Sequence, residues 1–235
     1  MRMTRRAVAA VALGAMAIAS LAACRVEQGT ALFVGKTRVT EEQVDQIVES
    51  LPQQADTAIG AYRSLTVDAL AVTELGKLVS ADTGNRPDAD AAENQRQFWM
   101  QQGVSSNREF IDLMGEAEGY RVMLMDGAEP VTPSDADVDA MAAAYEDHSG
   151  MALTDSQKAA ITADPDDPQW QEAFGSREQV ESYVNLWEQN FGNLKQLADY
   201  VDEYDVTVNP RYGDSFIVVS RGSQNEPVLT LPLES

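Results

Sequence analysis

The sequence predicts a mainly α-helical protein in which an N-terminal β-hairpin and a strand near the C-terminus form one small β-sheet. Between residues 40 and 204, apolar side chains recur at helical spacing, and helix-capping motifs separate the segments. Strand-like segments flank this helical region at residues 31–39 and 205–208. Because a two-stranded hairpin is not stable on its own in water, we expect residues 205–208 to pair with it and join the two ends of the helical body.

Residues 1–23 have the pattern of a bacterial export signal. Three arginines precede an apolar run over residues 7–23, as in a secretory signal peptide. The run ends in LAAC at residues 21–24, which resembles the lipobox of bacterial lipoproteins. In that family the cysteine receives a diacylglyceryl group and the chain is cut before it. The resemblance implies that Cys24 is the lipid attachment residue and that residues 24–30 form a tether, the alternatives being an ordinary signal peptide or an uncleaved membrane anchor.

The charge of the chain argues against a nucleic-acid binder. Its 235 residues carry 17 Lys and Arg against 38 Asp and Glu, a net charge of −21, and such a chain repels a polyanion. Removal of residues 1–23 takes away three arginines, so the mature chain has 14 basic against 38 acidic residues and a net charge of −24. We expect it to work in the bacterial cell envelope, on the extracytoplasmic side of the membrane. Only the lipid anchor would hold it there, because its charge opposes anionic headgroups.

The predicted hairpin leads directly into the first helix of the body. Residues 31–34 and 37–39 have strand character on either side of a two-residue turn that contains Gly35. The segment Thr40–Gln43 is a capping box, and the helix that it begins carries an apolar face as far as Leu51.

Three further helices are expected in the first half of the body. The first covers about residues 56–79 and is separated from the next by the segment 82–87. The second begins near residue 88 and ends at Gly103, and the third begins at a capping box over Ser106–Glu109.

The second half begins with a helix that we expect Thr132 to cap, with Pro133 in its first position. The segment Thr154–Gln157 is the capping box of a short helix, and residues 164–168 are expected to form an acidic loop. The longest amphipathic helix is predicted from Ser176 to about Tyr204. The tail contains two short β-like runs, 216–219 and 228–231, and the sequence leaves open whether they pair.

No motif predicts an enzyme. His148 is the only histidine. It lies at a predicted helix end, where its side chain interacts favourably with the helix dipole. A single His and a single Cys exclude a zinc site. Asp135, Asp137 and Asp139 have EF-hand spacing, but Ala140 stands where that loop requires Gly, and the segment has the pattern of a helix. We therefore expect no catalytic residue, no metal and no cofactor.

The methionines and tryptophans of the mature body are expected to fill its core. A flexible surface that binds varied apolar partners is the alternative for the methionines. The residues concerned are Met100, Met114, Met123, Met125, Met141 and Met151, together with Trp99, Trp170 and Trp187.

Three segments resemble the SurA N-terminal domain, which occurs in extracytoplasmic chaperones and foldases. Residues 31–45 (ALFVGKTRVTEEQVD) look like the start of that domain, and residues 131–139 (VTPSDADVD) are similar to one of its later helix starts. Residues 206–213 (VTVNPRYG) resemble the returning strand of its lipoprotein members. The resemblance implies a helical body of the SurA N-terminal or trigger factor-like kind over residues 31–212, followed by a C-terminal tail over residues 213–235.

The resemblance also implies a chaperone-like function, the binding of unfolded or exported polypeptides through an apolar cradle without ATP. The parvulin prolyl-isomerase module of the full foldases contains paired histidines, and this chain has one His. We therefore expect no isomerase activity. The alternative is an adaptor lipoprotein that binds one specific folded envelope partner. The residues that bind the client are not identified by the sequence.

Overall fold

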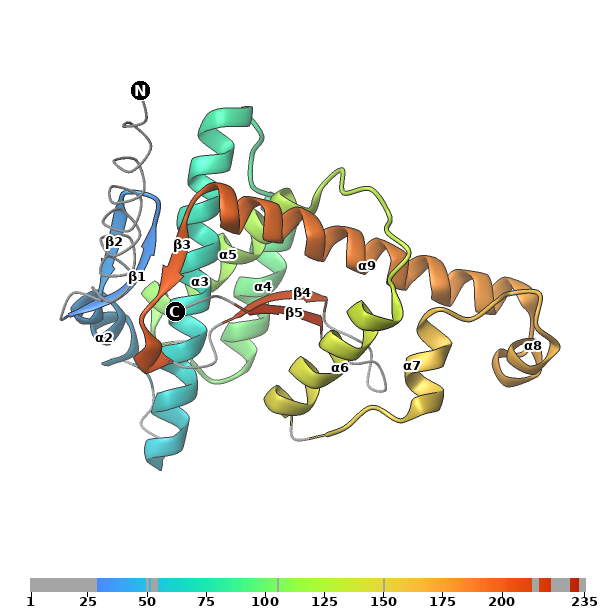
Figure 1. Ribbon diagram of the computed structural model, residues 1–235. Coiled ribbons are helices and arrows are strands. Elements are labelled where there is room, and N and C mark those ends of the chain that lie inside the picture. The colour runs from blue at the N-terminus through green and yellow to red at the C-terminus, as the bar shows by residue number, and fades with distance from the viewer. Residues whose placement is uncertain are drawn as a thin grey trace, which may run out of the picture.

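The small sheet joins the two ends of the helical body, as the sequence predicts (Figure 1). In the computed structural model, β1 (Thr30–Val34) lies between β2 (Thr37–Thr40) and β3 (Val206–Val208) and is antiparallel to both. The register of β1 and β3 places Leu32 opposite Val208, and both side chains are buried. The predicted fold class, mainly helical with a sheet formed by the N-terminal hairpin and a C-terminal strand, is confirmed.

The structure describes residues 29–49, 51, 55–104, 106–149, 151–212, 216–220 and 229–232. Cys24 and the whole predicted signal peptide lie outside these residues. Within them, eight α-helices, α2 to α9, make up most of the chain. None of these described helices combines the length and the apolar composition that crossing a membrane requires.

The hairpin turn and the cap of α2 (Glu41–Glu49) form as predicted. Gly35 takes a φ of 56°, a left-handed conformation that glycine adopts at little cost. The Gln43 N–H donates to Thr40 Oγ1 at 3.2 Å, and the Thr40 N–H donates to Gln43 Oε1 at 2.8 Å, which completes the capping box. The apolar face of α2 then packs against α3 (Ala55–Thr83) and the sheet.

The long helix α3 packs with α4 (Ala89–Gln101) and α5 (Arg108–Met125) to form the larger part of the molecule. A Cβ added at Gly76 of α3 would lie 2.4 Å from the ring of Tyr120 on α5. Glycine at this position therefore lets the two helices approach more closely than a larger residue would allow.

The capping box predicted at Ser106–Glu109 is wrong, because the cap of α5 is Asn107. The Asn107 Oδ1 accepts from the Phe110 N–H at 2.9 Å. Its Nδ2 donates to the carbonyl of Ile47 on α2 at 2.6 Å, and this hydrogen bond is buried. The Asn107 side-chain amide can hydrogen-bond to the Phe110 N–H and to the Ile47 carbonyl at once. A serine hydroxyl at position 106 cannot replace it in both hydrogen bonds.

The cap predicted at Thr132 is also wrong, because α6 (Asp135–Ser149) begins two residues beyond the predicted first position. Ser134 takes the capping role: its Oγ accepts from the Asp137 N–H at 3.3 Å, and Asp137 Oδ2 accepts from the Ser134 N–H at 2.8 Å. The Thr132 hydroxyl instead donates to Glu188 on α9 at 2.5 Å. The Thr132 hydroxyl is therefore used in a tertiary contact with α9 and does not cap α6.

The remaining helices are α7 (Asp155–Ile161), α8 (Pro168–Phe174) and α9 (Arg177–Glu203). The capping box at Thr154 and the long helix after Ser176 are confirmed. The helix α8 was not predicted, because seven residues are too few to show an apolar period. Its local signals are an N-cap at Asp167, Pro in the first turn and Gly175 at the C-cap with a φ of 97°.

The helix α9 extends across the molecule, from α8 at one end to the three-stranded sheet at the other (Figure 1). The two runs of the tail pair as an antiparallel hairpin, β4 (Phe216–Ser220) and β5 (Leu229–Pro232), which answers the question that the sequence left open. This hairpin contacts α9 along with α3 and α6, so it lies between the larger body and the helices α6 and α7.

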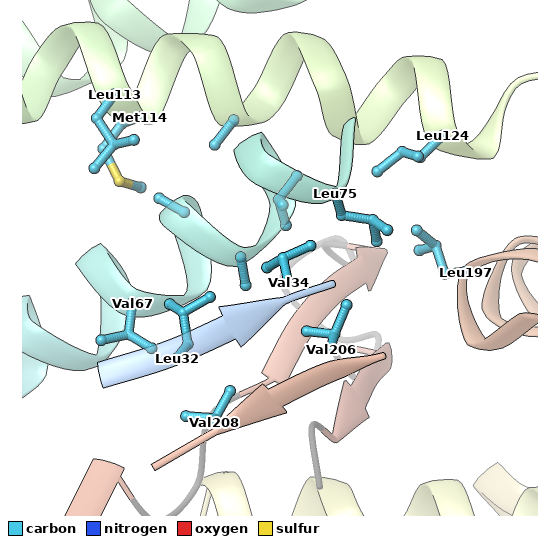
Figure 2. Packing of buried hydrophobic residues seen from close by; sticks show 14 of the residues in the cluster. Leu32, Val34, Val67, Leu75, Leu113, Met114, Leu124, Leu197, Val206 and Val208 are labelled. Carbon is cyan, nitrogen blue, oxygen red and sulfur yellow. The ribbon is translucent and has the colours of Figure 1, made fainter. Parts of the chain in front are cut away.

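The core lies where α3, α5 and α9 meet the sheet. Figure 2 shows Leu75, Leu124 and Leu197 of these helices close to Val34 and Val206 of the strands. The three leucines are fully buried, and each such side chain contributes about 1.5–3 kcal/mol of burial free energy. The core therefore holds the C-terminal half of α9 to the sheet and the first helices.

The connection between α5 and α6 crosses α9 at Gly192. The Val131 N–H donates to the Glu188 carbonyl at 2.9 Å. A Cβ added at Gly192 would lie 2.1 Å from the carbonyl oxygen of Glu129, which is a backbone atom and cannot move aside by a rotamer change. Only glycine fits at this crossing.

We expect Gly192→Ala to lower the free energy of unfolding by about 2 kcal/mol, because its methyl group has no room against the crossing backbone. The matched control is Gly60→Ala in α3, where no atom lies within 4 Å of the added Cβ. That control should raise the stability by about 0.5–1 kcal/mol, as alanine does in a helix. Urea denaturation followed by circular dichroism measures both. Equal stability of Gly192→Ala and the wild type would contradict the close crossing.

Tyr204 links the end of α9 to the end of α3. Its hydroxyl donates to Asp82 Oδ2 at 2.6 Å. The hydrogen bond to this carboxylate, together with the desolvation of the phenol and the negative charge of Asp82, raises the pKa of Tyr204 to about 12. The link therefore exists while the phenol is protonated.

We expect Tyr204→Phe to lower the free energy of unfolding by about 0.5–1 kcal/mol near neutral pH, since the bond is exposed to solvent. A folded-state pKa above the unfolded value of about 10 means that the stabilisation is complete below pH 10 and is lost as the pH rises towards 12. Urea denaturation of both proteins from about pH 8 to pH 11 should show the difference shrinking above pH 10. A difference that stays constant over this range would contradict the link.

Candidate functional site

Large apolar side chains are exposed at separate places on the described part of the molecule. Phe98 and Met100, near the end of α4, are 43% and 45% exposed, and Leu186 of α9 is 44% exposed. Met151, which follows α6, is 58% exposed. Single exposed apolar residues are common on soluble proteins. A candidate site therefore needs an exposed apolar residue that forms a continuous surface with its neighbours.

The methionines do not form that surface. Met114, Met123 and Met141 are buried in the core, Met125 packs against it, and only Met100 and Met151 are exposed. Trp187 is buried and Trp99 packs against the core cluster. The expectation that these side chains fill the core is therefore confirmed for most of them, and an apolar binding surface has to be made by other residues.

Aromatic rings connect α8 to the N-terminal half of α9, and we call these two elements, residues 168–191, the arm. The ring centroids along the row lie 6.2, 5.0, 6.3 and 6.3 Å apart, distances typical of favourable aromatic pairs. The row consists of Trp170, Phe174, Tyr183, Trp187 and Phe191. The last two rings are buried and the first three are partly exposed. The row therefore extends from the core to the surface of the arm.

A groove of about 560 Å³ lies on the arm beside this row. We call it the arm groove; it is lined by Phe174, Gln179, Ser182, Tyr183, Asn185 and Leu186. Phe174 comes from α8, while Tyr183 and Leu186 are three residues apart on α9 and so lie on one side of that helix. These three side chains form the apolar wall of the groove.

The other lining residues of the arm groove form a polar wall beside the apolar one. Gln179, Ser182 and Asn185 follow one another at intervals of three residues along α9, and all three are exposed. Among the described residues, none of their side-chain polar groups has a hydrogen-bond partner at this wall. The groove thus offers an apolar strip beside a line of hydrogen-bonding groups.

The surroundings of the groove are acidic. Residues 151–191 contain eight acidic and two basic residues. Both basic side chains are already paired: Lys158 lies 2.9 Å from Asp139, and Arg177 lies 2.8 Å from Asp166 and 3.2 Å from Glu181. The segment 151–191, which includes the arm, therefore presents a negative potential to any partner.

Glu178 adds a firmly ionised carboxylate near the groove. Hydrogen bonds from its own backbone N–H and from Ser176 lower the pKa of Glu178. Its charge is therefore present throughout the physiological pH range.

The exposed residues of α4 belong to a different kind of surface. The ring of Phe98 packs on Trp99 at 5.4 Å, and Trp99 packs on the buried Phe110 at 5.1 Å. The Trp99 Nε1 is buried and has no hydrogen-bond partner in the described part of the chain. The cluster of Phe98, Trp99 and Phe110 is therefore the outer edge of the core, and it lacks the polar lining of the arm groove.

A hollow between α2 and α3 is held by ion pairs. Arg63 pairs with Asp45, and Arg211 lies 3.3 Å from Glu41, so these arginines link α2 to α3 and to the segment after β3. Because each arginine is already paired with a carboxylate, we assign these residues a structural role.

Two of the three acidic residues with EF-hand spacing make other interactions. Asp137 caps α6 through Ser134, and Asp139 pairs with Lys158. His148 lies near the end of α6, and its side chain is outside the described residues. Over the described residues, no group of three or more His, Cys, Asp or Glu side chains is placed to hold a metal ion.

The chain matches no protein-family model, no curated protein and no solved structure. The arm groove was not found in the sequence, because it depends on α8, whose packing on α9 brings Phe174 to Tyr183. A signal was nevertheless present: Asp167-Pro168 and Gly175 are helix start and stop signals on either side of Trp170 and Phe174.

Proposed function

We propose that this protein is a lipid-anchored, chaperone-like protein of the bacterial cell envelope that binds unfolded or exported polypeptides without ATP. The observation that carries the proposal is the arm groove, an apolar and aromatic surface on a helical arm that projects from the larger body (Figure 1). The resemblance of residues 31–45, 131–139 and 206–213 to the SurA N-terminal domain supports the same function.

The chemistry of the groove fits a holding function. Phe174, Tyr183 and Leu186 can each bury part of a client side chain, which provides affinity in proportion to the apolar area covered. An open groove of this kind gives weak, reversible contacts, and the negative charge of the protein keeps a bound client in solution. Binding and release of this type need no nucleotide. We propose no prolyl-isomerase activity, since the chain has one His.

We expect the full chain, purified from bacterial membranes and held in phosphatidylcholine nanodiscs, to suppress the aggregation of a refolding client and to leave the folded client unbound. Leu186→Ser should weaken this suppression several-fold, because it removes the most exposed apolar group of the groove. Light scattering of the client and binding to its folded and unfolded forms are the measurements.

Met100→Ser is the matched control, since Met100 is 45% exposed and Leu186 is 44% exposed, and both lie on helices. This control should retain the activity of the wild type. An equal loss in both variants would place binding elsewhere than the arm groove. Binding to one folded envelope protein, with no effect on unfolded clients, would replace the chaperone by the adaptor function.

The membrane anchor has its own test. We expect Cys24→Ser to lose a labelled fatty acid, because no thiol remains to carry the diacylglyceryl group. Electrophoresis of the protein from cells fed that fatty acid measures the label, and the size of the chain shows whether residues 1–23 are still attached. A variant that keeps the label would contradict lipidation at Cys24.

A further inference from the structure

The polar wall of the arm groove has the spacing of an extended polypeptide. Gln179 and Asn185 are six residues apart on α9, which corresponds to about 9 Å along a helix. An extended chain advances about 3.3 Å per residue, so this wall is as long as roughly three residues of a strand. Side-chain amides and a hydroxyl both donate and accept hydrogen bonds, so they can meet the N–H and C=O groups of such a chain.

The apolar wall fixes where the side chains of that segment lie. Phe174 lines the groove from α8, while Tyr183 and Leu186 lie one helical turn beyond Gln179 and Ser182 and form a row beside the polar one on α9. Successive side chains of an extended chain point to opposite sides, so the central residue of the segment can direct its side chain to this wall while its neighbours point away. The wall accepts a large aliphatic or aromatic side chain.

The charges beside the groove determine what the neighbouring residues should be. Glu178 lies four residues before Ser182, and Glu181 lies four residues before Asn185, so each acid borders the polar row on the helix surface. The net charge of residues 151–191 is −6. A basic residue on either side of the apolar residue meets this negative potential, whereas an acidic one is repelled.

We propose, building on the chaperone function above, that the arm groove binds a short extended stretch of client in which one large apolar residue is flanked by Lys or Arg. The apolar residue lies against Phe174, Tyr183 and Leu186, and the peptide backbone lies along Gln179, Ser182 and Asn185. The flanking cations lie near Glu178 and near Glu181, which also pairs with Arg177. The same acidic surface disfavours an anionic membrane and a second copy of the acidic arm as occupants.

The test uses labelled short peptides with a Ser and Gly background and the full chain in phosphatidylcholine nanodiscs. The central triplet is Lys-Phe-Lys, Ser-Phe-Ser, Glu-Phe-Glu or Lys-Ala-Lys, and binding is read by fluorescence anisotropy at about 0.15 M salt. We expect Lys-Phe-Lys to bind about tenfold more tightly than Glu-Phe-Glu, with Ser-Phe-Ser between them. Lys-Ala-Lys should bind more weakly than Lys-Phe-Lys. Added salt should weaken the binding of both Lys-flanked peptides and leave that of Ser-Phe-Ser unchanged.

The double variant Glu178→Gln with Glu181→Gln should lower the affinity for Lys-Phe-Lys several-fold and leave that for Ser-Phe-Ser unchanged. The matched control is Asp199→Asn with Glu203→Gln, which removes two exposed charges from the other end of α9 and should have no effect on either peptide. Methylation of the backbone N–H groups beside the phenylalanine should weaken binding to the wild type, because it removes donors that meet the polar row.

Equal binding of Lys-Phe-Lys and Glu-Phe-Glu would overturn the proposal, as would an equal effect of the two double variants. A concentration-dependent dimer that Leu186→Ser abolishes would assign the groove to a second copy and overturn it as well. If the protein prevents client aggregation but the peptides bind with equal affinity, the chaperone function stands and the specificity fails. If the peptides bind in the expected order but no client is protected, the specificity stands and the general chaperone function fails.

Discussion

The central position of β1 in the three-stranded sheet is the constraint on which the rest of the structure depends. A strand from the start of the body pairs on one side with its hairpin partner and on the other with a strand that follows the last long helix. Asn209 reinforces this closure, because its backbone N–H donates to Ala31 at 2.8 Å and its side chain donates to Thr30 at 2.6 Å. Since α2 to α9 all lie between these strands in the sequence, the last of them, α9, has to lead the chain back to the sheet.

This requirement gives the two halves of α9 different tasks. The C-terminal half is buried through residues such as Leu197, against α3, α5 and the sheet. The N-terminal half extends beyond the crossing at Gly192 and packs with α7 and α8. Its aromatic row continues from the buried Phe191 to the partly exposed Tyr183. A long helix anchored at one end can therefore hold an apolar surface at a distance from the body, where the proposed client could reach it.

The arm groove combines features that suit a polypeptide better than a small ligand or a catalytic reaction. It is open, it has one apolar wall and one wall of amide and hydroxyl groups, and acidic residues surround it. Contacts of this kind recognise a class of sequences and not a single shape, and they form and break without a chemical step. The proposed anchor at Cys24 would keep this surface on the extracytoplasmic side of the membrane, where exported chains arrive unfolded.

The sequence by itself determined the described helices other than α8, most of their boundaries and the pairing of the terminal strands, because caps, turns and apolar periods are local properties. The box of Thr40 and Gln43 and the turn at Gly35 form as predicted. Only the tertiary structure decided which competing cap forms, because Asn107 gains a bond to Ile47 that neighbours in sequence cannot reveal. It also decided the site: the arm groove exists because the short α8 folds back on α9, and that contact depends on the packing of two ring systems from separate helices.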